Sequence, residues 1–257
     1  MEDDDDIGLD LDSVFPEEER PPTPEATVVV YEREERDGDA QNEWREVKIR
    51  LVGAHPLWGH HLWNAARAFA SYLDAAPELY RDRSVLELGA GGGLPGLVAA
   101  LNGAGRVVLT DYPDAALIAN LEHNVEENVP AALRERVDVK GYIWGQPVQP
   151  LLDGLRSEGF QLIIMSDLVF NHSQHDALLQ TCEQGLASDK EAVVLVFYTH
   201  HRPHLAHRDM EFFAKARERG WMCGEILRRR FAPMFPEDSG SSDVRATVAG
   251  WELRRSR

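Results

Sequence analysis

A cluster of four glycines at the end of an apolar segment constrains this chain more than any other feature. The stretch Ser84–Gly96 reads SVLELGAGGGLPG. Val85, Leu86 and Leu88 predict a buried strand, and Pro95 suits the first turn of a helix, where its missing N–H costs nothing. Glycine accepts positive φ and lets a ligand approach bare backbone. The stretch therefore predicts a strand, a glycine turn and a helix, the arrangement with which doubly wound α/β domains hold nucleotide-like cofactors.

Three interpretations of this turn compete. The GxGxxG spelling of dinucleotide-binding domains occurs at residues 91–96, and Asp111 lies about 20 residues further on, as the ribose acid of such domains does. The E-x-G-x-G spelling at residues 87–91 instead suits S-adenosylmethionine (SAM), and Asp111 would then accept both ribose hydroxyls. The third interpretation is a turn that binds nothing, which is disfavoured because clustered glycines cost backbone entropy without a packing return.

Strand-like apolar segments alternate with helical segments along most of the chain, which is typical of an α/β domain with a mainly parallel sheet. The expected core strands are the one before the glycine turn and residues 106–110, 136–140, 161–165 and 192–198. Segments 224–231 and 244–253 have no helix between them and predict an antiparallel pair at one edge of the sheet. We also expect a helix over residues 148–157 and a capping box formed by Ser173 and Asp176.

Charge divides the chain into two parts. Residues 1–26 hold eleven acidic residues and one basic residue, and they contribute −10 of the net charge of −17. They predict a disordered acidic tail. Residues 27–257 predict one large domain, which opens with a β-hairpin over residues 27–53. An acidic protein repels phosphate backbones, so we expect no nucleic-acid partner and instead a substrate with a basic character.

Cysteine content and hydropathy indicate the compartment. The two cysteines, Cys182 and Cys223, lie far apart and form no CxxC spacing, which fits a reducing environment. No apolar run approaches the roughly 18 residues that a membrane-spanning helix requires. We therefore expect a cytoplasmic protein without membrane contact, and we expect a monomer.

Seven stretches together carry a resemblance to a known family. They are HPLWGHHLWNAARAFA (55–70), VLELGAGGGLPGLVAA (85–100), TDYPD (110–114), GYIWG (141–145), SDLVFNHSQH (166–175), FYTHHRPHLAHRDMEFF (197–213) and PMFPEDSGSSDVR (233–245). Over about residues 44–253 the chain resembles the seven-stranded SAM-dependent protein methyltransferases. Its last two stretches resemble their fungal nicotinamide N-methyltransferase-like branch, which methylates the N-terminal α-amine and a lysine of translation elongation factor 1-alpha. The resemblance implies a Rossmann-like sheet with helices on both faces, SAM as cofactor and elongation factor 1-alpha as substrate.

The same resemblance assigns residues to the cofactor. Asp111 would hold the ribose, Trp144 would lie beside the adenine, and Ser166 would meet the cofactor at the carboxyl end of its strand. With the glycine turn included, the expected cofactor-binding residues are Trp58, Glu87, Gly89, Ala90, Gly91, Asp111, Trp144 and Ser166.

Asp167 is the best candidate for the reacting end of the site. Methyltransferases that act on base amines often carry Asn/Asp-Pro-Pro-Tyr at this point, whereas this chain has SDLV without prolines, which disfavours a nucleic-acid base as substrate. A carboxylate accepts a hydrogen bond from an amine, but it also raises the pKa of that amine, and the nucleophile must be neutral. We therefore expect Asp167 to position the amine, with Phe170 and Tyr198 as apolar walls that align it with the methyl group.

A histidine cluster follows in an HHxxHxxH pattern, at His200, His201, His204 and His207. Histidine is a common zinc ligand, but no cysteine lies near and two arginines bring positive charge into the segment. We expect no metal here. A rim loop that contacts the substrate, or a hydrogen-bond network, is the expected role.

Two other functions remain compatible with these residues. One is a small-molecule N-methyltransferase of the nicotinamide type. The other is a non-catalytic binding protein that keeps the methyltransferase fold. Transfer of label from SAM to nicotinamide, to a protein or to neither distinguishes the three.

Overall fold

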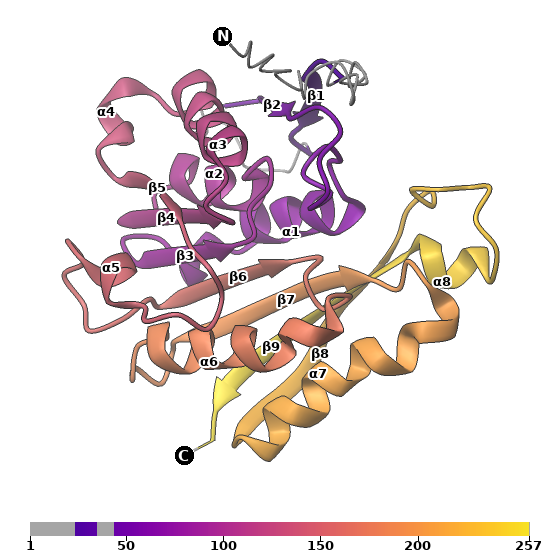
Figure 1. Cartoon of the computed structure of the whole chain (residues 1–257). Helices are drawn as coiled ribbons and strands as arrows, with labels where there is room; N and C mark the ends of the chain where they lie inside the picture. Colours follow the sequence, from indigo (N-terminus) through magenta and orange to yellow (C-terminus); the bar gives the residue numbers. More distant parts are fainter. Residues whose placement is uncertain (1–23, 35–43, 257) are drawn as a thin grey trace, which may run out of the picture.

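The computed structural model describes residues 24–34 and 44–256 (Figure 1). Seven of its strands form one sheet: β3 (Ser84–Leu88), β4 (Arg106–Asp111), β5 (Val137–Gly141), β6 (Leu162–Ser166), β7 (Val193–Thr199), β8 (Trp221–Arg230) and β9 (Thr247–Arg255). Their order across the sheet is β5-β4-β3-β6-β7-β9-β8. The first five are parallel, whereas β9 is antiparallel to both β7 and β8. The predicted Rossmann-like sheet with an antiparallel pair at one edge is confirmed.

Helices cover both faces of the sheet, as Figure 1 shows. One face carries α1 (Asn64–Ala75), α2 (Leu94–Leu101) and α3 (Ala115–Asn128), and the other carries α5 (Gln149–Leu152), α6 (His175–Gly185) and α7 (Ala206–Glu218). The shorter elements are α4 (Ala131–Arg134), α8 (Ser242–Ala246) and the 3₁₀ turns η3 (Pro77–Leu79), η4 (His172–Gln174) and η5 (Pro203–Leu205).

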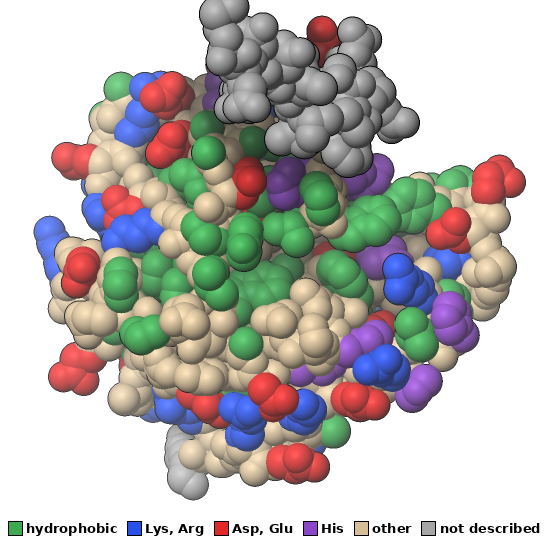
Figure 2. Space-filling view, in the orientation of Figure 1, with side chains coloured by type: hydrophobic (Ala, Val, Ile, Leu, Met, Phe, Trp, Pro, Cys, Tyr) green, Lys and Arg blue, Asp and Glu red, His purple; other side chains and the backbone are tan. Residues whose placement is uncertain are grey.

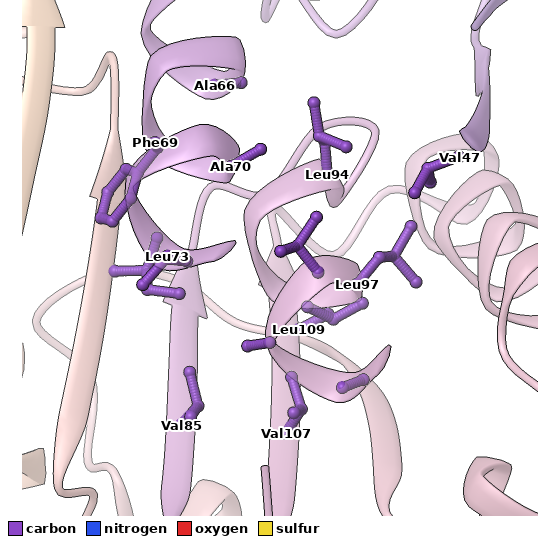
Figure 3. Close-up of a cluster of buried hydrophobic side chains, with 14 of the residues drawn as sticks. Val47, Ala66, Phe69, Ala70, Leu73, Val85, Leu94, Leu97, Val107 and Leu109 are labelled. Carbon is purple, nitrogen blue, oxygen red and sulfur yellow. The ribbon is translucent and has the colours of Figure 1, made fainter. Parts of the chain in front are cut away.

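The alternation of side chains along each strand explains these two layers. Val85 and Leu195 pack on the face of α1 and α2, while the adjacent Leu86 and Val196 pack on the face of α6 and α7. Both faces of the central strands are therefore buried, which is why these segments read as continuous apolar runs. Figure 3 shows part of the first layer, with side chains of α1 and α2 facing those of β3 and β4.

A separate two-stranded antiparallel sheet precedes α1, formed by β1 (Thr27–Glu32) and β2 (Glu46–Leu51). Asn120, Asn124 and Asn128 lie four residues apart on one face of α3, and their side chains bond backbone groups along the free edge of β2. Asn124 also donates to the carbonyl of Gly92 at 3.0 Å, so α3 ties the small sheet to the glycine turn. The predicted β-hairpin is confirmed in its two strands, and its turn lies outside the described residues.

The predicted acidic tail, residues 1–26, also falls almost entirely outside the described residues, which begin at residue 24. Among the helices in the described ranges, none combines the length and hydropathy needed to cross a bilayer.

Local predictions were wrong in three places. The segment 244–253 was expected to be a strand with no helix before it, but its first residues belong to α8, and β9 begins at Thr247. The helix expected over residues 148–157 is a single turn, because the chain passes through Gly154 with φ +82° shortly after α5. The capping box of Ser173 and Asp176 does not form. Ser173 lies in η4, ahead of α6, and its hydroxyl donates to Asn171 Oδ1 at 3.1 Å instead.

Candidate active site

The glycine turn takes left-handed backbone at three of its residues, with φ of +58° at Gly89, +55° at Gly91 and +77° at Gly93. Residues that carry a Cβ are strained at positive φ. A Cβ at Gly89 would also lie 2.8 Å from Leu168 Cδ2 and 3.0 Å from the ring of Trp144. At Gly91 a Cβ would meet no atom within 4 Å. The turn thus keeps its shape through glycine and presents bare backbone to open space.

A cavity of about 640 Å³ lies beside this turn, at the carboxyl ends of the parallel strands, where open α/β sheets bind ligands. It brings together nine of the expected residues: Trp58, Gly89, Ala90, Gly91, Asp111, Trp144, Ser166, Asp167 and Phe170. Hydrophobic side chains gather across the middle of the face shown in Figure 2. Those that are exposed at the cavity are Leu57, Trp58, Tyr112, Ile143 and Phe170. An apolar lining with a few convergent polar groups is typical of a small-molecule site.

Asp111 ends β4 with its carboxylate turned to the glycine turn. Oδ2 accepts a hydrogen bond from the N–H of Gly91 and Oδ1 one from the N–H of Tyr112, each at 2.7 Å. Burial raises the pKa of Asp111, and the two hydrogen bonds oppose that effect. Because a carboxylate has about four acceptor positions, each oxygen can accept a further hydrogen bond from the cavity. The group therefore fits the paired hydroxyls of a ribose.

Three other expected residues offer groups that fit the rest of SAM. Ser166 lines the cavity at the carboxyl end of β6, and its Oγ is buried without a hydrogen-bond partner among the described residues. The ring of Trp144 lies next to Gly89 and provides a flat apolar surface. Trp58 lines the cavity and is 43 % exposed, and its left-handed φ of 63° is a conformation that costs backbone energy.

Asp167 also has left-handed backbone, with φ 58°, and it is 5 % exposed. Its Oδ1 accepts the N–H of Thr199 at 3.1 Å, and its Oδ2 lies 2.9 Å from Nε2 of His201. These two contacts hold the carboxylate in place where Asp167 lines the cavity. Phe170 lies on the same loop and is 43 % exposed. Asp167 and Phe170 therefore share one cavity with the glycine turn.

Glu87 does not line the cavity, contrary to the expectation that it binds the cofactor. Its side chain points into the layer beneath the turn and is fully buried. Oε2 accepts the N–H of Gly96, in the first turn of α2, at 2.8 Å, and Oε1 has no partner among the described residues. Burial raises the pKa of Glu87 to about 8. Glu87 thus supports the start of α2 from below.

Glu87→Gln is expected to remove a pH dependence of stability. The unfolded carboxyl ionises near 4.5 and the folded one near 8, so the stabilising protonated form is fully present below about pH 4.5 and lost as pH rises through about 8. Glutamine stays neutral and keeps an acceptor for Gly96. Between pH 5 and pH 9 the unfolding free energy of the wild type is therefore expected to fall relative to that of the variant, by on the order of 4 kcal/mol.

Urea unfolding of both proteins at several pH values measures this difference, and Glu127→Gln on the exposed face of α3 is the matched control. A difference that stays constant over this pH range would contradict the assignment of a neutral Glu87.

Tyr198 lies in the core and does not reach the cavity, which corrects its expected role as a wall of the site. Its neighbour Phe197 stacks on Phe69 of α1 with ring centroids 4.1 Å apart. Because successive side chains of a strand point to opposite faces, Tyr198 points toward α7. It is 2 % exposed, and its hydroxyl donates to Met210 Sδ at 3.2 Å.

The histidine cluster forms a hydrogen-bond network. Asp209 of α7 accepts both His200 Nδ1, at 2.6 Å, and His172 Nε2, at 2.7 Å, and so joins the loops that follow β6 and β7. His201 contacts Asp167, and His204 is exposed. In the described ranges no group of three or more His, Cys, Asp or Glu side chains is arranged to hold a metal ion.

Two residues that line the cavity were not among the residues expected at the site, and the contact of His201 with Asp167 was not expected either. Trp63 and Arg202 line the cavity, and His201 lies behind Asp167. The available signal for His201 and Arg202 was their position directly after a buried strand, where parallel strands place their ligand-binding loops. Nothing in the local sequence indicated which histidine of the cluster meets Asp167, because that contact spans 34 residues of the chain.

The sequence profile of a protein family described as lysine methyltransferase matches residues 45–219, more than half of the chain. The chain belongs to the lysine methyltransferase family. This enzyme is therefore a SAM-dependent N-methyltransferase that acts on protein. Of the two cofactor interpretations of the glycine turn, the family membership supports SAM and not a dinucleotide.

Similar proteins from fungi cover nearly the whole of this methyltransferase. It is 44 % identical over 265 residues to the protein N-terminal and lysine N-methyltransferase EFM7 of Cryptococcus neoformans var. neoformans serotype D (strain B-3501A), with 96 % of this chain and 89 % of the relative covered. It is also 44 % identical to efm7 of Schizosaccharomyces pombe (93 % and 92 % covered). Identity to EFM7 of Candida glabrata is 47 % (93 % of each chain covered).

Solved structures of low sequence identity show the same fold. TYW2 of P. horikoshii in complex with MeSAdo superposes with a TM-score of 0.52 at 16 % identity, covering 82 % of this chain and 69 % of that one. The O-methyltransferase of Bacillus cereus in complex with SAH gives a TM-score of 0.51 at 15 % identity, covering 78 % and 84 %. At such identities the likeness concerns the fold alone.

Proposed function

We propose that this methyltransferase modifies the N-terminal α-amine and the adjacent lysine of translation elongation factor 1-alpha. The observation that carries the proposal is the carboxylate of Asp167, which is held by two contacts on the wall of the cavity beside the glycine turn. The names of the fungal relatives support N-terminal and lysine amines as acceptors. The resemblance at residues 197–213 and 233–245 supports the elongation factor as the target.

The residues that line the cavity have different roles in methyl transfer. When bound, SAM supplies a methyl group on a positively charged sulfur. Asp111 and the glycine turn hold the cofactor, and Asp167 accepts a hydrogen bond from the substrate amine at its carboxylate. Phe170 covers the apolar side of the site and excludes water. Alignment of the amine with the methyl carbon, together with exclusion of water, accounts for the rate.

Charge supports a basic substrate segment. Asp and Glu number 44 against 27 Lys and Arg, so the enzyme attracts positively charged protein segments. We include in the proposal that the enzyme works in the cytoplasm, where translation takes place, and that it works as a monomer.

Incubation with labelled SAM tests the proposal. We expect label to enter recombinant unmethylated elongation factor 1-alpha, and mass spectrometry to locate it at the N-terminal α-amine and the adjacent lysine. Nicotinamide is the competing substrate and is expected to remain unlabelled. Label in nicotinamide alone would favour the small-molecule alternative, and label in neither compound, nor in any protein of a cell extract, would favour a binding protein.

A further inference from the structure

His201 and Asp167 form a pair that leads away from the cavity. His201 follows β7, and its Nε2 lies 2.9 Å from Asp167 Oδ2. The other carboxylate oxygen accepts the backbone N–H of Thr199, so the carboxylate cannot turn away from His201 without losing both contacts. Asp167 lines the cavity and His201 does not. The imidazole therefore lies directly behind the group proposed to meet the amine.

The second nitrogen of this imidazole has no hydrogen-bond partner in the part of the chain that the structure describes. Nδ1 of His201 makes no hydrogen bond to the described residues, and 18 % of the side chain is exposed. The ring of Trp63 packs against the imidazole, with centroids 4.8 Å apart, and limits its rotation. The imidazole of His201 thus contacts Asp167 through Nε2, while part of the same side chain remains accessible to solvent.

The proposed reaction requires a proton to leave the site. Lysine ε-amines and protein α-amines have ordinary pKa values of about 10.4 and about 8, so the substrate arrives mainly as an ammonium ion at neutral pH. Only the neutral amine has a lone pair for the methyl carbon. Asp167 alone favours the ammonium form. A group that accepts the proton and passes it to solvent resolves this conflict.

We propose that His201 relays the amine proton from Asp167 to solvent. This inference rests on the proposed function, in which a protein amine meets Asp167. The relay begins with His201 neutral and its proton on Nδ1. One N–H proton of the ammonium moves to Asp167, the Asp167 carboxyl passes a proton to the lone pair of Nε2, and Nδ1 releases its proton to water. Exchange with water then returns the proton from Nε2 to Nδ1 before the next turnover. The amine lone pair then forms the C–N bond while the S–C electron pair returns to sulfur. His201 does not touch the substrate and acts through Asp167 as a positioning residue.

Three carboxylates near His201 favour the uptake of a proton by its imidazole. Burial lowers the pKa of His201, but Asp167, Asp209 and Asp238 raise it by more, so the pKa lies above the ordinary 6.5. These carboxylates come from the loop after β6, from α7 and from the loop that precedes α8. A raised pKa strengthens the imidazole as a proton acceptor.

His201→Gln tests the relay in the full-length enzyme. Glutamine can still donate to Asp167 but cannot carry a proton. With recombinant elongation factor 1-alpha as substrate, we expect kcat at pH 7 to fall about 100-fold. SAM affinity, measured by calorimetry, is expected to stay within about threefold. The acid limb of the kcat–pH profile is expected to move upward by about one pH unit or more, toward the pKa of the substrate amine. His204→Gln, an exposed histidine of the same segment, is the control and should match the wild type.

Chemical rescue separates a relay from a structural role. Added imidazole is expected to raise the kcat of His201→Ala at least about tenfold, because a small base can replace the missing side chain. A wild-type rate and profile for His201→Gln would overturn the relay. So would loss of rate with an unchanged profile and no rescue. If the wild-type enzyme labels no elongation factor, the proposed function itself fails, and that outcome is visible before any variant is compared.

Discussion

Asp167→Asn is expected to reduce kcat for methylation of elongation factor 1-alpha by about 10²- to 10⁴-fold, the range for loss of a group that manages a proton in the transition state. Asparagine tolerates the left-handed backbone at this position, where φ is 58°. Its carbonyl can still accept the N–H of Thr199, and its amide can donate to His201. The variant therefore removes the negative charge and leaves the local geometry in place.

Steady-state kinetics and calorimetry together check this expectation. We expect SAM affinity to change by less than about threefold, because the charge is lost at the acceptor side of the cavity. Phe170→Leu, which keeps an apolar side chain on the same loop, serves as the comparison and is expected to lose far less activity. Retention of more than about half of the wild-type kcat by Asp167→Asn would remove Asp167 from the proposed mechanism.

Asp111→Ala is expected to weaken SAM binding by about 10²- to 10⁴-fold. The substitution removes the acceptor proposed for two ribose hydroxyls, and hydrogen bonds to a charged group contribute about 1.5–3 kcal/mol each. It also leaves the N–H groups of Gly91 and Tyr112 without their acceptor, so the glycine turn loses one of its supports. Both effects act on the cofactor and not on the protein substrate.

Calorimetric titration with S-adenosylhomocysteine measures the effect, since the product shares the ribose. Glu122→Gln, an acid on the exposed face of α3, is the matched control for the loss of one negative charge. A dissociation constant for Asp111→Ala within threefold of the wild-type value would contradict the ribose assignment. Thermal unfolding without ligand shows whether the turn itself has been destabilised.

The architecture was predictable because it depends on signals that are local in the sequence. Buried strands such as Leu162–Ser166 are short apolar runs, and the helices between them repeat their apolar residues every three to four positions. The antiparallel strand pair at the edge of the sheet was predicted because no long helical pattern separates the two segments, and the structure places only the five-residue helix α8 between β8 and β9. The predicted start of α6 was wrong because Ser173 donates a hydrogen bond to Asn171 instead of capping the helix. Both hydrogen bonds are short-range, and the sequence pattern does not decide between them.

The glycine turn, Asp111 and Asp167 were predictable as members of one site, because parallel strands bring their carboxyl ends to one edge of a sheet. The sequence alone thus determined the fold class and most of the residues that the structure brings together around the cavity. Side-chain direction was decided only by the tertiary structure. Tyr198 and Phe197 are adjacent and equally apolar, and the strand sends one toward α7 and the other toward α1.

The same reason applies to Glu87 and His201. Glu87 belongs to the glycine motif in sequence, but its position on β3 directs its carboxylate into the layer beneath the turn, where Gly96 meets it. His201 was one of four histidines in a cluster, and only the pairing of β6 with β7 brings it to Asp167. Spacing along the chain specifies which strand ends are neighbours, whereas the three-dimensional packing specifies which side chains meet there.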